Sequence, residues 1–154
     1  MKRILFINIL FVLCVIFTGC SKDKQTLTDN TWKVESMKVH ADSALMYRPD
    51  SSYFRYLPDS SILVQWGETP ITLSFPKKNE YVYKAEINEA WGNVKIGNNK
   101  IIFKGAMQFS MCCDSPFAND CLGLLNGGIN SYTIDNNKLI LKGNKGEVIN
   151  FVKQ

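Results

Sequence analysis

The sequence has little of what most catalytic and metal sites are built from. It contains a single histidine, His40, in 154 residues, which excludes metal sites built from several histidines. It has no Gly-x-Ser-x-Gly nucleophile motif, no Gly-x-x-x-x-Gly-Lys phosphate loop and no Cys-x-x-Cys redox pair. No internal repeat or low-complexity run is present. We therefore expect a protein that is not an enzyme and that holds no metal or cofactor.

Charge of either sign is also modest. The chain has 18 basic and 14 acidic residues, and two of the basic ones, Lys2 and Arg3, lie in a segment that we expect to be removed. Without them the formal net charge falls from +4 to about +2, too little for a nucleic-acid partner. Hydrophobic residues make up 45% and aromatic residues 12%, which is typical of one globular domain.

The longest hydrophobic run lies at the N-terminus. It extends from Ile4 to Phe17 behind two basic residues, and it is too short to cross a hydrocarbon core of roughly 30 Å. This arrangement is typical of a secretory signal peptide. The next residues, Thr18-Gly19-Cys20, resemble the lipobox of bacterial lipoproteins. In that family the cysteine thiol receives a diacylglyceryl group, and its amine receives a fatty acyl chain such as palmitate after cleavage.

The resemblance implies a signal peptide of residues 1–19 and lipidation of Cys20; an uncleaved anchor or an ordinary signal peptide is the alternative. Residues 20–26 then form the lipidated N-terminus and a short polar tether. Two or more acyl chains make membrane attachment stable. Ser21 after the cysteine favours the outer membrane, by resemblance to the enterobacterial sorting pattern. Whether the protein faces the periplasm or the outside stays open.

Beyond the tether, the sequence predicts mainly antiparallel β structure. Apolar and polar residues alternate in short runs that are separated by turn-forming Asn, Gly and Pro. About eight strands in a domain of this size favour a barrel-like or strongly curved sheet. The candidate runs from which these strands are drawn are 32–39, 53–56, 62–66, 71–75, 81–87, 93–96, 100–104, 131–134, 138–141 and 148–152.

One segment, residues 116–126, is predicted to be a short α-helix. Ser115 suits the N-cap, Pro116 suits the first helical position, and Gly127-Gly128 suits the C-terminal end. Between these signals, apolar residues recur at helical spacing and form one stripe. They are Phe117, Cys121, Leu124 and Leu125.

In chain order these segments resemble the META (HslJ-like) domain of bacterial envelope proteins. The run 27–34, with Trp32, resembles the family's Leu-x-Gly-Thr-x-Trp opening. Residues 99–103 followed by Met111-Cys112-Cys113 resemble its strand and Met-x-Cys run, and 131–141 resemble its closing hairpin. The resemblance implies a single β-rich META-like domain over residues 27–154. The opening is also similar to that of lipocalin-like lipoproteins, which is the second choice.

Three cysteines remain once Cys20 is lipidated, and an oxidising compartment favours a disulfide. Alternation along a strand directs Cys112 and Cys113 to opposite faces, and Cys121 lies on the apolar stripe of the helix. We favour a Cys113–Cys121 bond, with Cys112 as the alternative partner and a vicinal Cys112–Cys113 bond as a third choice. A zinc site of these thiolates with His40 is disfavoured, because adjacent cysteines lack the usual two-residue spacer.

A tyrosine-rich loop is the candidate for ligand binding. Tyr47, Tyr53 and Tyr56 lie in the long segment 40–61, and aromatic rings at a barrel mouth can form a binding platform. The same rings can equally fill the barrel. Burial of all three would exclude the platform.

We therefore expect an outer-membrane lipoprotein of the cell envelope with a non-catalytic binding or structural role, because META domains have no settled catalytic role. Its expected partners are the membrane, through the lipid anchor, and an envelope protein or a small apolar ligand. One alternative is a lipocalin-like carrier, which needs an interior cavity of several hundred cubic ångströms. Another is an inhibitor of an envelope enzyme, acting through the loop from Ala41 to Pro58.

Overall fold

The computed structural model describes residues 26–47, 53–56, 63–66, 69–109 and 114–154. For residues 53–56, 63–66 and 106–109 it describes the backbone alone. The described elements are, in order, β1 (Trp32–Lys38), β2 (Met46–Tyr47), β3 (Tyr53–Tyr56), β4 (Leu63–Trp66), β5 (Thr72–Ser74), β6 (Glu80–Lys84), β7 (Glu89–Ile96), β8 (Ile101–Phe109), α2 (Pro116–Gly127), β9 (Ile129–Asp135), β10 (Lys138–Gly143) and β11 (Val148–Lys153).

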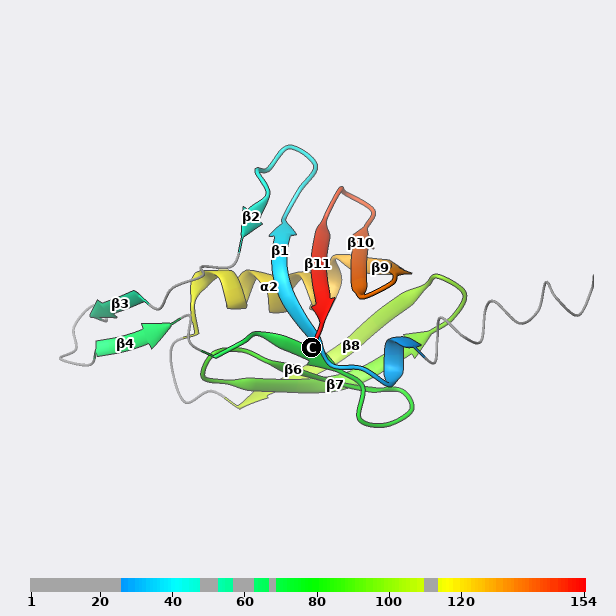
Figure 1. The fold of residues 1–154 in the computed structure, drawn as a ribbon, viewed down its shortest axis with the longest axis horizontal. Coiled ribbons are helices and arrows are strands. Elements are labelled where there is room, and N and C mark those ends of the chain that lie inside the picture. Colours follow the sequence, from blue (N-terminus) through cyan, green and yellow to red (C-terminus); the bar gives the residue numbers. More distant parts are fainter. Residues whose placement is uncertain (1–25, 48–52, 57–62, 67–68, 110–113) are drawn as a thin grey trace, which may run out of the picture.

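The main sheet is antiparallel and nearly closes on itself. Its strands follow the order β8-β7-β6-β5-β1-β11-β10-β9, with β2 paired to β1, while β3 and β4 form a separate two-stranded sheet (Figure 1). The two ends of this path meet at a bridge between Lys100 and Ser131, where the Tyr132 N–H donates to the Asn99 carbonyl at 3.1 Å. The fold is a barrel-like sheet, as the sequence predicts.

One core fills the inside of this sheet. The inward residues of the central strands alternate with outward ones, as a half-buried strand requires. The largest fully buried side chains include Trp32, Tyr81, Tyr83 and Phe151. The Trp32 indole N–H donates to the Leu27 carbonyl at 2.9 Å, so its one polar atom is satisfied. This bond also fixes the segment that leads into β1.

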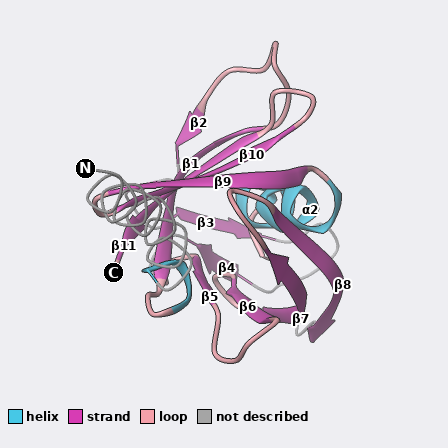
Figure 2. Cartoon of the chain, turned by 90° about the vertical axis from the view of Figure 1, so that its right-hand side faces the viewer, coloured by secondary structure: helices cyan, strands magenta, loops and turns pink. Residues whose placement is uncertain are grey.

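Helix α2 confirms the predicted helix nearly to the residue. The Ser115 hydroxyl accepts a hydrogen bond from the Ala118 N–H at 3.1 Å, and Pro116 follows the cap. The Gly128 N–H donates to the Leu124 carbonyl at 2.8 Å and closes the last turn. The helix lies between β8 and β9 on the open side of the barrel (Figure 2). Its buried residues are Phe117, Ala118, Cys121, Leu122, Leu124 and Leu125.

Three of the predicted turns contain an asparagine in the left-handed backbone conformation. Asn79, Asn99 and Asn136 have φ values of 70°, 54° and 55°, a conformation that asparagine tolerates better than most residues.

The sequence analysis did not predict β2, which lies within a segment interpreted as a loop. Two residues are too short to show alternation, and β2 forms by pairing Met46 and Tyr47 with β1. In the ranges described, no helix is long and apolar enough to span a membrane.

Candidate functional site

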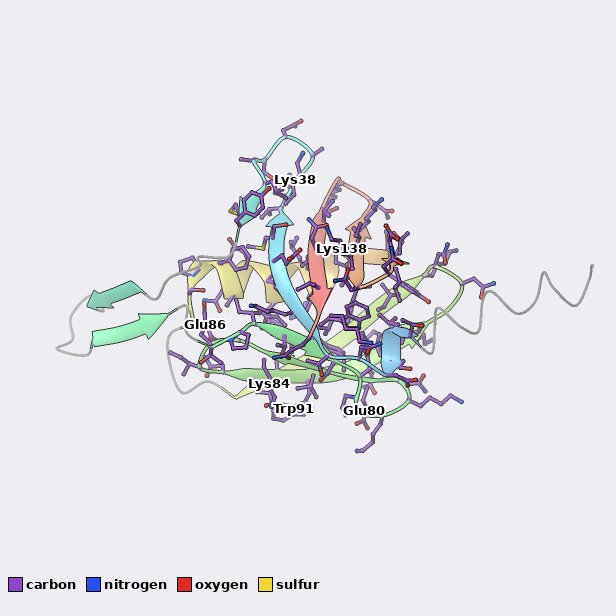
Figure 3. All side chains as sticks on the ribbon, in the orientation of Figure 1. Lys38, Glu80, Lys84, Glu86, Trp91 and Lys138 are labelled. Atoms are coloured by element: carbon purple, nitrogen blue, oxygen red, sulfur yellow. The ribbon has the colours of Figure 1, made fainter. Side chains whose placement is uncertain are left out.

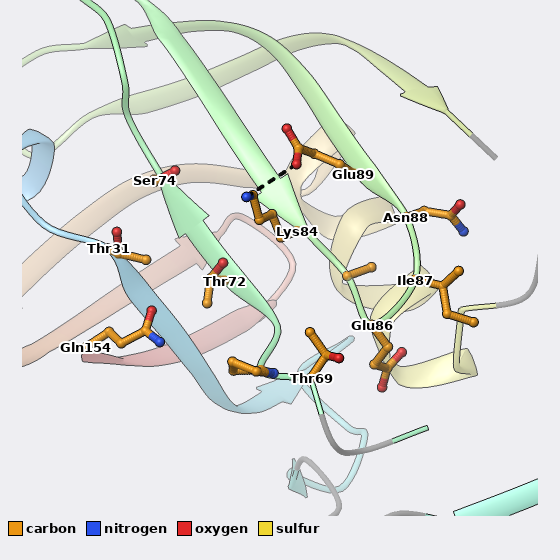
Figure 4. Close-up of a pocket in the computed structure, with 12 residues that line it drawn as sticks. Thr31, Thr69, Thr72, Ser74, Lys84, Glu86, Ile87, Asn88, Glu89 and Gln154 are labelled. Carbon is orange, nitrogen blue, oxygen red and sulfur yellow. Dashed lines mark ion pairs between the residues drawn. The ribbon is translucent and has the colours of Figure 1, made fainter. Parts of the chain in front are cut away.

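An open groove of about 450 Å³ lies on the outside of the barrel, where β5, the β6–β7 hairpin and the end of the chain come together (Figure 4). Most of its lining side chains are polar. The lining residues are Thr31, Thr69, Pro70, Thr72, Ser74, Lys84, Ala85, Glu86, Ile87, Asn88, Glu89 and Gln154. It is therefore a hydrogen-bonding surface and differs from the enclosed apolar cavity of a carrier.

One wall of the groove is built by strand pairing. Thr72 lies opposite Lys84 in the β5–β6 register, and Lys84 lies opposite Glu89 in the β6–β7 register. The Lys84 ammonium is 3.5 Å from the Glu89 carboxylate, and both side chains are about half exposed. An ion pair this exposed contributes little to stability. Its two charges therefore remain available to a polar ligand.

The opposite wall is fixed to the start of α2 by a set of hydrogen bonds that we call the helix latch: Glu86, Ile87, Asn88, Asp114 and Ser115. The Glu86 carboxylate accepts from the Ser115 N–H at 3.0 Å and from its hydroxyl at 2.8 Å. The Asp114 carboxylate accepts from the backbone N–H groups of Ile87 and Asn88 at 2.9 and 3.2 Å, and from the Asn88 side chain at 2.7 Å.

The latch satisfies buried polar groups at a helix N-terminus. Asn88, Asp114 and Ser115 are all nearly inaccessible to solvent. Negative charge is favourable there because unpaired N–H groups point out of the first turn. The two carboxylates are thus held by structural hydrogen bonds, and the groove wall is rigidly coupled to the helix.

Two further buried titratable side chains, Cys121 and Tyr83, lie beneath the latch. Cys121 has no disulfide partner among the described residues, and complete burial raises the pKa of its thiol from 9.0 to about 12. Burial also raises the pKa of Tyr83 well above its usual range, and the neighbouring Cys121 adds to that effect. The Tyr83 hydroxyl donates to the Ala118 carbonyl at 2.8 Å. Because a thiolate is the reactive form, the reduced Cys121 thiol is unreactive at neutral pH in the folded state.

Several predicted site residues lie outside the described part of the chain. Cys20 is among them, and so are Cys112 and Cys113, so lipidation and the pairing of Cys121 stay predictions. The same holds for parts of the loop from Ala41 to Pro58, namely 48–52 and 57–58.

The structure describes the predicted tyrosine platform only in part. The Tyr47 side chain is 71% exposed, so this ring does not fill the barrel. Tyr53 and Tyr56 bound β3, where they lie opposite Trp66 and Leu63 of β4. Tyr47 is not among the described residues that line the groove.

Sequence reasoning missed the groove and the latch. A weak signal was present, because Thr72 and Ser74 are hydroxyl residues two positions apart on a strand and therefore share a face. Nothing local linked them to Glu86 or to the C-terminal Gln154. Within the described ranges, no group of three or more His, Cys, Asp or Glu side chains is placed to hold a metal ion.

The fold and the groove define a small β-barrel-like domain with a packed interior and an external polar groove. The chain belongs to the META domain family, whose model matches residues 25–154. This match supports the predicted META (HslJ-like) domain over the lipocalin-like choice. A search of curated proteins gave no match.

Two solved structures share the fold. A Burkholderia xenovorans protein determined by NMR is 18% identical, with 84% of this chain and 85% of that chain covered and a TM-score of 0.58. A second protein determined by NMR is 19% identical, with 83% and 92% covered and a TM-score of 0.52. Identities this low support the architecture alone.

Proposed function

We propose that this protein is an outer-membrane lipoprotein of the cell envelope, anchored through Cys20, whose META domain is a non-catalytic binding module. The observation that carries the proposal is the contrast between a filled interior and a hollowed exterior. Trp32, Tyr81, Tyr83 and Phe151 occupy the inside of the barrel, whereas the groove of about 450 Å³ opens on the outside. A ligand is therefore bound on the surface.

The filled interior argues against the carrier alternative. A small apolar ligand needs a dry cavity lined by apolar side chains. Here the ring of Tyr81 packs edge-on against Phe103 with centroids 4.9 Å apart, and its hydroxyl reaches Asn126 of α2 at 3.3 Å. These side chains bridge from the sheet to the helix through the space that a carried ligand would take.

The groove chemistry favours a polar ligand. Hydroxyl groups of Thr31, Thr72 and Ser74, the amide of Gln154 and the Lys84–Glu89 ion pair offer both donors and acceptors. Of the two carboxylates that line the groove, Glu86 is held by the latch and Glu89 is paired with Lys84. This arrangement supports the proposal of binding without catalysis.

The binding role is tested by filling the groove. In Ser74→Tyr the added ring occupies the groove, while Thr133→Tyr places the same ring on an exposed outward position of β9 as a control. Each acylated protein is used to capture partners from its own envelope, and the captured components are identified by mass spectrometry. We expect the Ser74 variant to lose a component that the parent and the control retain. Identical capture by all three proteins would contradict the groove assignment.

The anchor is tested separately. Intact mass measurement of the mature protein should give a chain that begins at Cys20 and carries acyl groups. A Cys20→Ser variant should not mature in the same way. A retained signal segment, or an unmodified residue 20, would contradict the lipoprotein assignment and leave the groove experiment unaffected.

A further inference from the structure

The outward side of three neighbouring strands carries a regular frame of lysines. In the paired registers, Val152 of β11 lies between Lys33 of β1 and Lys138 of β10. Val148 of β11 lies between Lys38 and Lys142 in the same way. We call this surface the lysine-framed face: Lys33, Lys38, Lys138 and Lys142 around Ile140, Val148, Asn150 and Val152. Lys38 and Lys138 are labelled on it in Figure 3.

Positive charges outnumber negative ones on this face within the described structure. None of its four lysines forms an ion pair with a described residue, whereas Lys77 and Lys84 elsewhere do. Two carboxylates lie close by: Glu35 on β1, and Asp135 of β9 opposite Lys138. The face thus keeps a net positive charge. Its centre is apolar, because Ile140, Val148 and Val152 are only partly buried.

We infer that the lysine-framed face rests against the anionic headgroups of the membrane to which the protein is tethered; this inference builds on the proposed Cys20 anchor. Lysine stems can cover apolar surface while their ammonium groups reach phosphates. Each lysine of a cluster next to an anionic lipid surface adds its own share to the electrostatic attraction between protein and membrane. A face with an apolar centre and a cationic rim therefore suits the headgroup layer of an anionic membrane, where the ammonium groups can contact phosphates.

The length of the tether keeps the start of the domain near the membrane, and with it the first strand of the lysine-framed face. The six residues from Cys20 to Gln25 span at most about 3.4 Å each, or roughly 20 Å in all. The body is fixed immediately afterwards, because Leu27 is fully buried and the Thr31 carbonyl accepts from the Gln154 N–H. Strand β1 begins at Trp32, so six residues, Thr26 to Thr31, separate the end of the tether from the strand that carries Lys33 and Lys38.

Lysine footprinting tests the orientation. The full lipidated protein is reconstituted into vesicles of phosphatidylethanolamine and phosphatidylglycerol, or of phosphatidylcholine alone, and acetylation of each lysine is followed by mass spectrometry. In the anionic vesicles we expect the four framing lysines to react roughly threefold or more slowly than in detergent. Lys95 and Lys104, exposed on β7 and β8, should be unchanged and serve as internal controls.

Charge reversal provides the matched variants. Lys138→Glu with Lys142→Glu should abolish the protection of Lys33 and Lys38, and Lys95→Glu with Lys104→Glu should leave it intact. Protection in both kinds of vesicle would overturn the role of charge. Protection absent from vesicles but present in an envelope extract would assign the face to an acidic protein and overturn the lipid assignment.

Flotation separates this inference from the anchor. In about 1 M salt, charge attraction is screened and only the acyl chains hold the protein on vesicles. Flotation there without lysine protection at low salt overturns the lysine-framed face and leaves the anchor standing. Flotation only at low salt, with the lysines protected, overturns the anchor and supports the face. If the protein neither floats in high salt nor shows lysine protection at low salt, both the anchor and the membrane contact of the lysine-framed face are overturned.

Discussion

Gly143 ends β10 at a position where the neighbouring atoms leave no room for a Cβ. A Cβ at this position would overlap the Gly128 carbonyl and the Glu147 carboxylate. The Glu147 carboxylate cannot easily move, because it accepts from the Lys145 N–H at 2.7 Å. That bond and the N–H of Glu147 itself hold the pKa of this carboxyl below its usual value. The turn is therefore crowded on both sides.

We predict that Gly143→Ala destabilises the fold by about 1–3 kcal/mol, the usual cost of overpacking. Gly123→Ala is the control, because a Cβ there meets nothing within 4 Å and alanine favours the helix. That change should stabilise by about 0.5–1 kcal/mol. Urea unfolding at neutral pH measures both. Equal stability of Gly143→Ala and the parent would contradict the predicted clash.

The buried thiol of Cys121 predicts a loss of stability in alkali. The folded state keeps the thiol proton up to about pH 12, whereas the unfolded chain releases it near pH 9. This contribution to the free energy of unfolding is therefore fully present below pH 9 and declines as the pH rises from there. With reductant present, the parent should lose stability more steeply above pH 9 than Cys121→Ala. Parallel pH profiles would contradict the prediction.

Helix α2 depends on contacts that are distant in sequence. Its cap and apolar stripe are local, and the sequence predicts both. The latch instead joins residues 26 to 29 positions apart, from the β6–β7 hairpin to Asp114 and Ser115. No periodicity within either segment encodes that pairing. Local sequence patterns do not predict the register of the strands either. They also do not predict the groove, which combines Thr31, Thr72 and Gln154 from three separate parts of the chain.

We predict that Asp114→Ala destabilises the protein by about 1.5–3 kcal/mol, because it leaves buried N–H groups without their charged acceptor. Asp120→Ala, on the exposed side of the same helix, should change stability by less than about 0.5 kcal/mol. Urea unfolding gives the two free energies. Hydrogen exchange should also show faster exchange in α2 for the Asp114 variant. Unchanged exchange and stability would show that the latch is not needed.

At the scale of the whole molecule, the central strands of the barrel are held by more pairing than the seam, which is the place where β8 and β9 meet. Strands β1 and β11 are paired on both sides and supply fully buried residues such as Trp32, Ile149 and Phe151. The seam between β8 and β9 is held by the bridge from Lys100 to Ser131 and by the Tyr132–Asn99 bond. Within the described ranges, strands β3 and β4 pair with each other and with no other strand.

This gradient predicts the order of hydrogen exchange in the folded protein. Amides of β1, β10 and β11 should exchange slowest, those of the seam faster, and those of β3 and β4 fastest, because an isolated two-stranded ribbon is marginally stable. Exchange measured by mass spectrometry at neutral pH checks the order. Exchange at the seam as slow as in β11 would show that the barrel is fully closed and cooperative.

The bond between the Gln154 N–H and the Thr31 carbonyl, 3.0 Å long, has a practical consequence. It brings the last residue of the chain beside the start of the first strand, and Gln154 itself lines the groove. An affinity tag fused to the C-terminus would therefore crowd both the groove and the approach of the tether. A reporter inserted between Lys77 and Lys78, in an exposed turn, leaves both undisturbed.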